Sequence, residues 1–413
     1  MQASKHVSGD RLNQRMDAMA MIGAIPGGGV NRQALSEEDA RAQLLLVKWA
    51  TALGMEATRD DVGNLFLRLN GLDNTLPPAV TGSHMDTQPT GGRYDGIYGV
   101  MAGLEAIEAI VAGGITPLRP LELVAWANEE GSRFAPSLMG SGAHVGARAV
   151  DEVLNLRDAD GVSVQQALEQ IEPLLAHIPK RPSGAPAHCY VEAHIEQGPV
   201  LERENLTIGV VTGVQGKHTY RITVQGEAAH AGTAAYRERK DALLSATAMV
   251  QSMSQAFHDD DDITRFTVGR FNVAPNAPSV VAREVVFSID LRHPNLDQLN
   301  RLSALVPSIC AAHAAPCTVQ VERLYTADPI VFPEAIQDLI EQAAAALGLP
   351  GKRMLSAAGH DACLMHRICP TGMIFIPSVG GVTHNEAEFS RPDDLTAGAR
   401  VLANVLARLS SQG

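Results

Sequence analysis

The feature that most constrains the fold is the alternation of short apolar strands with helices in the first part of the chain. Residues 64–69, 78–82 and 121–127 have the pattern of strands, and residues 97–112 have the apolar spacing of a helix. Strands that alternate with helices indicate an α/β fold with a largely parallel sheet. In such a sheet, ligands bind beyond the carboxyl ends of the strands. We therefore expect a site where these strands end.

The two ends of the chain add further elements of the same kind. Ser36 followed by Asp39 resembles a capping box that opens a helix. The elements predicted here are helices at 10–23, 36–53, 333–347 and 393–409, and a buried strand at 373–377. The last part of the chain thus resumes the α/β pattern of the first.

The stretch between these parts has a different order of elements. It reads as a strand at 219–224, a helix at 241–256, strands at 266–273 and 284–291, a helix at 296–313 and a strand at 318–324. The order βαββαβ is that of a ferredoxin-like unit. A chain of 413 residues is also too long for one ordinary core. We predict one α/β domain, formed by residues 1–212 and 329–413, with residues 213–328 inserted as a second domain.

Composition and charge exclude several classes of partner. The chain is 45% hydrophobic and 19% charged, which is typical of a globular protein. Its net charge of -13 argues against binding to nucleic acid, because phosphate binding needs a basic surface. The sequence contains no run of eighteen apolar residues, which a membrane-spanning helix would need. The first ten residues also lack the apolar core of a signal peptide. We therefore expect a cytoplasmic protein with no membrane or nucleic-acid partner.

The cysteines limit the kind of metal site that the chain could form. There are five, at positions 189, 310, 317, 363 and 369, with no CxxC pair. Scattered cysteines of odd number are typical of reduced, mostly buried thiols. Any metal would therefore be held by histidines and carboxylates.

Histidines and carboxylates gather where strands and Gly-rich loops end. The candidates are His84, Asp95, the pair Glu129 and Glu130, His194 and His384. Singly, each has an ordinary explanation, such as a satisfied polar histidine, a turn at Asp95-Gly96 or a solvated pair of glutamates. Together they point to a cation, because an acidic pair directly after the apolar strand 121–127 is costly without one. A two-metal site also needs a shared carboxylate, for which Asp95 is the natural candidate.

Seven segments of the chain carry a resemblance to a known family. They are residues 82–87, 91–96, 128–134, 192–199, 229–233, 359–362 and 377–384. In this order they resemble the M20 metallopeptidase family, and more narrowly its hydantoinase/carbamoylase branch. The resemblance runs from about residue 10 to the end of the chain.

The resemblance implies two divalent metal ions per subunit, with zinc expected and manganese, cobalt or nickel as alternatives. One ion would take His84, Asp95 and His194, and the other would take Asp95, Glu130 and His384. Glu129 is similar to the general base of the family. A histidine at position 194 is typical of this branch, whereas many M20 peptidases have a carboxylate there.

The resemblance also implies which residues contact the substrate. Arg292 is similar to the arginine that binds the substrate carboxylate, and His230 to the histidine that stabilises the developing oxyanion. The other substrate-binding positions are Gln197, His218, Asn276 and Gly359. In this branch His230 and Asn276 reach across from a partner subunit. This implies a homodimer in which residues 213–328 form the lid and dimerisation domain and the rest forms the catalytic domain.

The expected reaction is hydrolysis of the carbamoyl C–N bond of a small N-carbamoyl amino acid, either L-α or β, to the amino acid, ammonia and CO2. Allantoate amidohydrolase activity and aminoacylase or dipeptidase activity on the same site are alternatives. His218 and Thr219 stand where allantoate hydrolases carry an arginine pair, which weakens the allantoate alternative. A non-catalytic binding protein is a third alternative, but all five ligand positions and Glu129 are present, which favours an enzyme.

Overall fold

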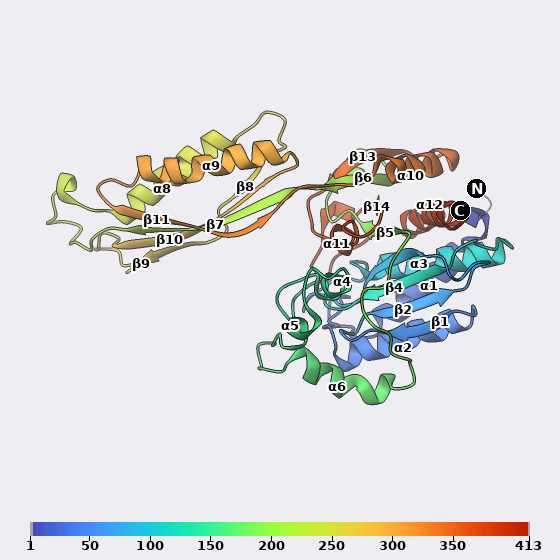
Figure 1. Cartoon of the computed structure of the whole chain (residues 1–413). Coiled ribbons are helices and arrows are strands. Elements are labelled where there is room, and N and C mark those ends of the chain that lie inside the picture. The colour runs from blue at the N-terminus through green and yellow to red at the C-terminus, as the bar shows by residue number, and fades with distance from the viewer. Residues whose placement is uncertain (1–2, 412–413) are drawn as a thin grey trace. The chain divides into compact units, whose positions relative to one another are not determined.

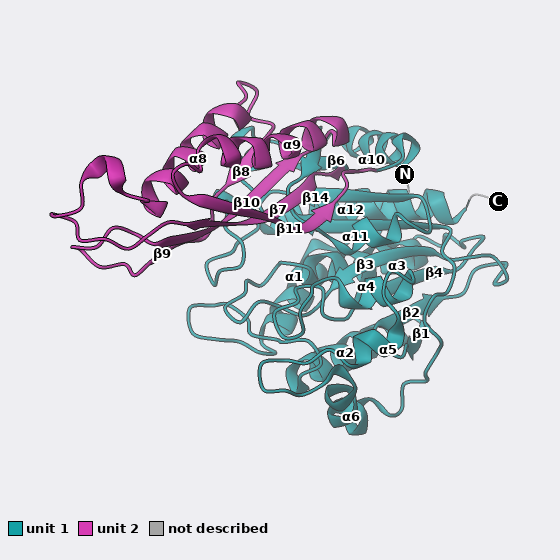
Figure 2. Ribbon diagram, turned by 60° about the vertical axis from the view of Figure 1, so that its left-hand side comes forward, with its two compact units in different colours: residues 1–212, 332–413 teal, residues 213–331 magenta. Residues whose placement is uncertain are grey.

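The structure is a computed structural model that describes residues 3–411. The chain divides into two compact units, shown in Figure 2. Unit 1 consists of the chain up to Thr212 and from Phe332 onward, and unit 2 consists of residues 213–331.

The sheet of unit 1 has four parallel strands in its middle and antiparallel strands on both sides. Its order is β1-β2-β4-β3-β5-β14-β6, with β13 also beside β6. The strands are β1 (Glu56–Arg59), β2 (Leu65–Leu69), β3 (Ala79–His84), β4 (Leu121–Trp126), β5 (Cys189–Ile195), β6 (Ile208–Val214), β13 (Gly351–Ser356) and β14 (Thr371–Ile376). β4, β3, β5 and β14 run parallel, whereas β1 and β2, β2 and β4, and β6 and β14 pair antiparallel. The predicted largely parallel central sheet is confirmed.

The parallel strands are buried on both faces. Every residue of β3, β4, β5 and β14 is buried, as expected for strands covered by helices on each side. Helix α3 (Ile97–Ala112) packs on β3 and β5, and α12 (Pro392–Ser410) packs on α3 and β14 (Figure 1). Gly99 allows this approach, since a Cβ there would lie 2.3 Å from the Ala193 carbonyl oxygen of β5. The loop before α3 is thereby held beside the carboxyl ends of β3 and β5.

The remaining helices of unit 1 include three close to the predicted helices at 10–23, 36–53 and 333–347, and five that were not predicted. They are α1 (Gly9–Ala20), α2 (Glu37–Thr51), α4 (Met139–His144), α5 (Val150–Leu154), α6 (Val164–Leu175), α7 (Val200–Arg203), α10 (Glu334–Ala346) and α11 (Asp361–Met365). Ser36 caps α2 by accepting from the Asp39 N–H at 3.1 Å. The capping box is modified, because Asp39 accepts from the Leu35 N–H instead of the Ser36 N–H.

Unit 2 has one antiparallel sheet and two helices. Its elements are β7 (Gly216–Gln225), α8 (Ala242–Phe257), β8 (Arg265–Thr267), β9 (Phe271–Ala274), β10 (Glu284–His293), α9 (Leu296–Ala312) and β11 (Thr318–Ala327). The sheet order is β11-β7-β10-β8, and β9 also pairs with β10. The predicted single strand at 266–273 is wrong. Two short strands, β8 and β9, flank residues 268–270. Gly269 weakens a strand there because it has no side chain to pack against its neighbours.

Burial in unit 2 follows the alternation of its strands. Tyr220, Ile222 and Val224 of β7 are buried with Phe287 and Ile289 of β10 in one cluster. The residues between them are exposed or partly exposed, as in a sheet with helices on one face only. Helices α8 and α9 both pack on β7 and β10.

All five cysteines are buried and unpaired, as predicted. Among residues 3–411, no helix combines the length and the apolar composition that a bilayer crossing requires.

Candidate metal centre

The five predicted ligands come together in unit 1, at the carboxyl ends of the parallel strands. His84 ends β3, His194 lies in β5, Asp95 lies just before α3, Glu130 follows β4, and His384 follows the short 3-10 helix η3 (Val379–Gly381). All five line a cavity of about 230 Å³. A larger cavity of about 750 Å³ beside α6 contains none of them, so the site is assigned from its donor atoms and not from its size.

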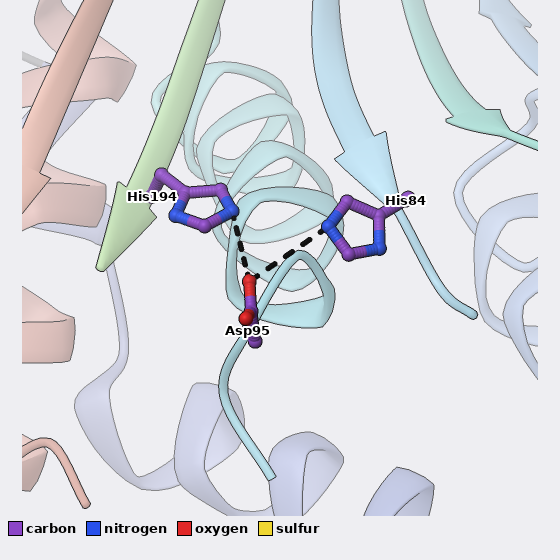
Figure 3. A group of neighbouring side chains, drawn as sticks. All are labelled: His84, Asp95 and His194. Carbon is purple, nitrogen blue, oxygen red and sulfur yellow. Dashed lines mark ion pairs between the residues drawn. The ribbon is translucent and has the colours of Figure 1, made fainter. Parts of the chain in front are cut away.

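One oxygen of Asp95 faces two histidines. Asp95 Oδ1 lies 3.2 Å from His194 Nε2 and 3.8 Å from His84 Nε2. Figure 3 shows both imidazole rings directed at this carboxylate from two neighbouring strands. The three residues form a buried group whose ligand atoms lie within 4.8 Å of one another.

The other oxygen of Asp95 faces a second group. Asp95 Oδ2 lies 3.2 Å from His384 Nε2, and the same nitrogen lies 3.4 Å from Glu130 Oε2. Asp95, Glu130 and His384 again have ligand atoms within 4.8 Å of one another. Asp95 therefore offers one oxygen to each of two three-donor groups, which is the geometry of a carboxylate that bridges two metal ions.

The histidine tautomers fit metal binding. His84 Nδ1 lies 2.9 Å from the Asp86 carbonyl oxygen, and His194 Nδ1 lies 2.9 Å from the Ile195 carbonyl oxygen. A carbonyl can only accept, so in each ring Nδ1 carries a proton, and Nε2 is the nitrogen directed at the site. Metal-binding histidines are commonly oriented in this way.

The charge of the site also fits divalent cations. Burial, and next the charge of Asp95, raises the pKa of Glu130 to about 8. Burial raises the pKa of Asp86 to about 7. These carboxyl groups resist ionisation because burial removes the water that would stabilise their charge, and a bound cation would offset that cost. The residues present therefore fit two divalent ions.

Glu129 lies beside the first group without belonging to it. Its Oε2 is 3.5 Å from His84 Nε2, and its backbone N–H donates to Asp86 Oδ1 at 3.1 Å. Burial, and next the charges of Asp361 and Glu130, raises the pKa of Glu129 well above its usual range. A carboxylate with a raised pKa accepts protons readily, which is what a general base must do.

Two predicted substrate-binding residues lie at the same cavity. Gln197 and Gly359 line it. Gln197 Nε2 donates to Asp95 Oδ2 at 2.8 Å, whereas its Oε1 is buried and accepts no hydrogen bond from any described residue.

The other four predicted substrate-binding residues lie in unit 2. His230 and Asn276 are exposed, and Arg292 is half-buried with two bonds from its guanidinium to Asp290. His218 differs from them. It is buried in unit 2, where its Nδ1 lies 2.5 Å from Ser303 Oγ, and its contact with the substrate stays a prediction.

Three residues near the ligands were not predicted as part of the site. His360 lines the cavity, with its ring centroid 4.5 Å from that of His194. Gln88 donates to Glu130 Oε2 at 2.8 Å, and Glu388 accepts from the Asp95 N–H at 3.0 Å. His360 lies within a segment that carries the resemblance and Gln88 directly follows another, but Glu388 had no signal in spacing.

Gly96 is expected to be essential for the position of His84. It has a φ of 66°, and a Cβ there would lie 2.3 Å from the His84 ring. Gly96→Ala should therefore lower metal affinity about tenfold or more, because the ring must move. Gly54→Ala is the control, since Gly54 also has a positive φ but a Cβ there would meet open space. Both variants place a side chain at a positive φ, which L-residues rarely adopt, so both carry backbone strain. Equal metal affinities in the two variants, measured by calorimetry, would contradict this account.

Comparison with known proteins places the chain in a family. The model of Peptidase family M20/M25/M40 matches residues 80–408. The N-carbamoyl-L-amino-acid amidohydrolase of Rhizobium meliloti is 35% identical over 97% of this chain and 96% of that protein. The allantoate amidohydrolase of Bacillus subtilis is 33% identical over 97% of both.

Solved structures agree. A hydantoinase/carbamoylase family amidase from Burkholderia multivorans is 40% identical, with a TM-score of 0.94 over 98% of this chain and 99% of that one. The chain belongs to peptidase family M20/M25/M40, in its hydantoinase/carbamoylase branch.

Proposed function

We propose that this protein is a binuclear metal-dependent amidohydrolase that cleaves the carbamoyl C–N bond of a small N-carbamoyl amino acid, L-α or β. The observation that carries the proposal is the position of Asp95, which offers one oxygen to each of two three-donor groups beside Glu129. Relatives over nearly the whole chain are named N-carbamoyl-L-amino-acid amidohydrolases, which supports this substrate class.

The residues of unit 1 have distinct tasks in this proposal. His84, Asp95 and His194 would hold one ion, and Asp95, Glu130 and His384 would hold the other. Bound divalent ions would lower the pKa of water and polarise the carbamoyl carbonyl. Glu129 takes a proton from the attacking water and passes it to the leaving nitrogen. The products are the amino acid, ammonia and CO2.

His230 is set up to donate a hydrogen bond. Its Nδ1 accepts from the Gly232 N–H at 3.0 Å and from the Thr233 N–H at 3.2 Å. The ring proton is therefore on Nε2, the tautomer that stabilises a developing oxyanion. We propose that His230 and Asn276 act in a homodimer, each reaching the site of the partner subunit.

Arg292 is proposed to bind the carboxylate of the substrate. Asp290 accepts from its Nε at 2.8 Å, which fixes the plane of the guanidinium. Arg292→Lys keeps the charge but loses the planar fork, so KM for carboxylate-bearing substrates should rise by about tenfold or more while kcat changes less. Arg221→Lys is the matched control, since Arg221 is an exposed arginine of the same sheet, paired with Glu322. If steady-state kinetics show an unchanged KM in Arg292→Lys, the proposal that Arg292 binds the carboxylate of an amino acid substrate is wrong.

The substrate is tested by ammonia release from a panel of compounds. The panel contains N-carbamoyl-L-α-amino acids, N-carbamoyl-β-alanine, allantoate, N-acyl amino acids and dipeptides, the last two followed by amine release. We expect the highest kcat/KM for a carbamoyl amino acid. Allantoate is the second candidate, because relatives at 33% and 34% identity are named allantoate amidohydrolases. A clear preference for allantoate, or for acyl amino acids, would replace the proposed substrate.

A further inference from the structure

A buried carboxylate outside the proposed ligands connects the loops that carry two of them. Glu388 is 3% exposed. Its Oε1 accepts from the backbone N–H of Tyr94 and of Asp95, both at 3.0 Å. Two successive N–H groups on one oxygen fix the backbone at the residue that is proposed to bridge the metals.

The second oxygen of Glu388 reaches the Asp95 side chain through Thr383. Thr383 Oγ1 lies 3.0 Å from Glu388 Oε2 and 3.1 Å from Asp95 Oδ2. A hydroxyl has a single hydrogen, so both carboxylates compete for the same donor. Thr383 directly precedes His384, a proposed ligand of the second ion. Glu388 thus links the backbone and the side chain of Asp95 to a segment 288 positions further along the chain.

The loop before α3 is shaped around this carboxylate. A Cβ at Gly92 would lie 2.1 Å from Glu388 Oε1 and 2.2 Å from its carboxyl carbon. Only glycine allows the loop to close on Glu388 at this distance. The close contact between Gly92 and Glu388 therefore requires the loop before α3 and the segment of Glu388 to lie as they do here.

We propose that Glu388 is a positioning residue that holds the Asp95 carboxylate with one oxygen toward each proposed metal site. The inference rests on the proposed two-metal function. Without Glu388, the backbone N–H groups of Tyr94 and Asp95 lose their acceptor and Thr383 loses one of its two. The Asp95 carboxylate then keeps its bonds from Gln197 and Thr383 but loses the fixed backbone and the anchored hydroxyl that orient its two oxygens. Removing such a partner of a metal ligand typically costs about 10–100-fold in metal affinity.

The test uses the metal-depleted full-length protein, titrated with Zn²⁺ or Mn²⁺ in a calorimeter. Glu388→Ala should weaken at least one of the two binding events by about 10–100-fold. Glu388→Gln should restore binding to within about threefold, because the amide oxygen accepts both N–H bonds and the amide nitrogen donates to Thr383.

Asp60 provides a matched control. It is 4% exposed and accepts from the N–H groups of Val62 and Asn64 and from the hydroxyl of Ser183, but it contacts none of the proposed ligands. Asp60→Ala should lower the thermal unfolding temperature and leave both metal affinities as in the wild type. An equal loss of metal affinity in Asp60→Ala and Glu388→Ala would overturn the inference, because the effect would then follow from lower stability alone.

A second variant covers the case in which Glu388→Ala does not fold. Thr383→Val removes the shared hydroxyl and leaves the backbone bonds to Glu388, and should weaken metal binding about tenfold. Wild-type affinity in folded Glu388→Ala, or in Thr383→Val where Glu388→Ala does not fold, would overturn the inference and leave the proposed function standing. Absence of metal binding by the wild type would instead overturn the proposed function itself.

Discussion

Glu129→Gln is expected to lower kcat by about 10²–10⁴ while the protein keeps its metal ions. The substitution preserves the size of the side chain but removes the proton acceptor. Glu129 lies 3.5 Å from His84 but belongs to neither three-donor group, so the metal sites should survive the change. The effect should fall on kcat more than on KM, because the proton is moved during the reaction and not on binding.

The measurement pairs steady-state ammonia release with elemental analysis of the same sample. Glu152→Gln, which changes an exposed glutamate in the same unit, controls for handling and loss of charge. If Glu129→Gln stays fully active, the general base lies elsewhere. If it loses activity together with its metal, Glu129 is a ligand and its proposed role is wrong.

Asp95→Asn is expected to weaken both metal sites at once. The amide keeps the shape of the side chain but offers only one oxygen, whereas the carboxylate offers Oδ1 to His84 and His194 and Oδ2 to His384. Removing a hydrogen-bond partner of a metal ligand typically lowers metal affinity about 10–100-fold. Losing the shared ligand itself should therefore lower metal affinity by more than that. Activity should fall with the metal content.

Asp61→Ala, at an exposed aspartate of the same unit, is the control. Calorimetric titration of the metal-depleted variants distinguishes the outcomes. Loss of one binding event with the other unchanged would show that Asp95 serves a single ion and does not bridge two.

Strands β4 and β14 could be predicted because they are mostly apolar runs, and β3 because its short apolar start runs into Gly82-Ser83-His84. Strand β5 could not, because Glu192 and His194 interrupt the apolar pattern. Glu192 is tolerated there because it accepts from Ser83 Oγ at 2.7 Å and from the Ala362 N–H at 2.9 Å. Both partners are distant in the sequence, so no local pattern reveals them.

The site residues also divide into those that the sequence predicts and those that it does not. Four ligands could be proposed because His84 and Glu130 end strands and Asp95 and His384 adjoin Gly-rich loops. The resemblance added the role of His194 and assigned the five to two ions. The contacts of Gln88 with Glu130, and of Thr383 and Glu388 with Asp95, join segments far apart in the chain and leave no spacing to detect.

The predicted strand at 219–224 did not include His218, which the structure places in β7 on the same buried face as Tyr220 and Ile222. The substrate contact that the resemblance implies for His218 stays a prediction.

The most direct test of the account is the number of metal ions that one folded chain binds. The metal-depleted protein is titrated with Zn²⁺ or Mn²⁺, its metal content is determined by elemental analysis after removal of free ions, and ammonia release is assayed on the same samples. The account predicts close to two ions per chain, loss of activity on chelation, and its return when divalent ions are added back. A folded sample that stays active with no metal, or that reaches full activity with a single ion, would contradict it.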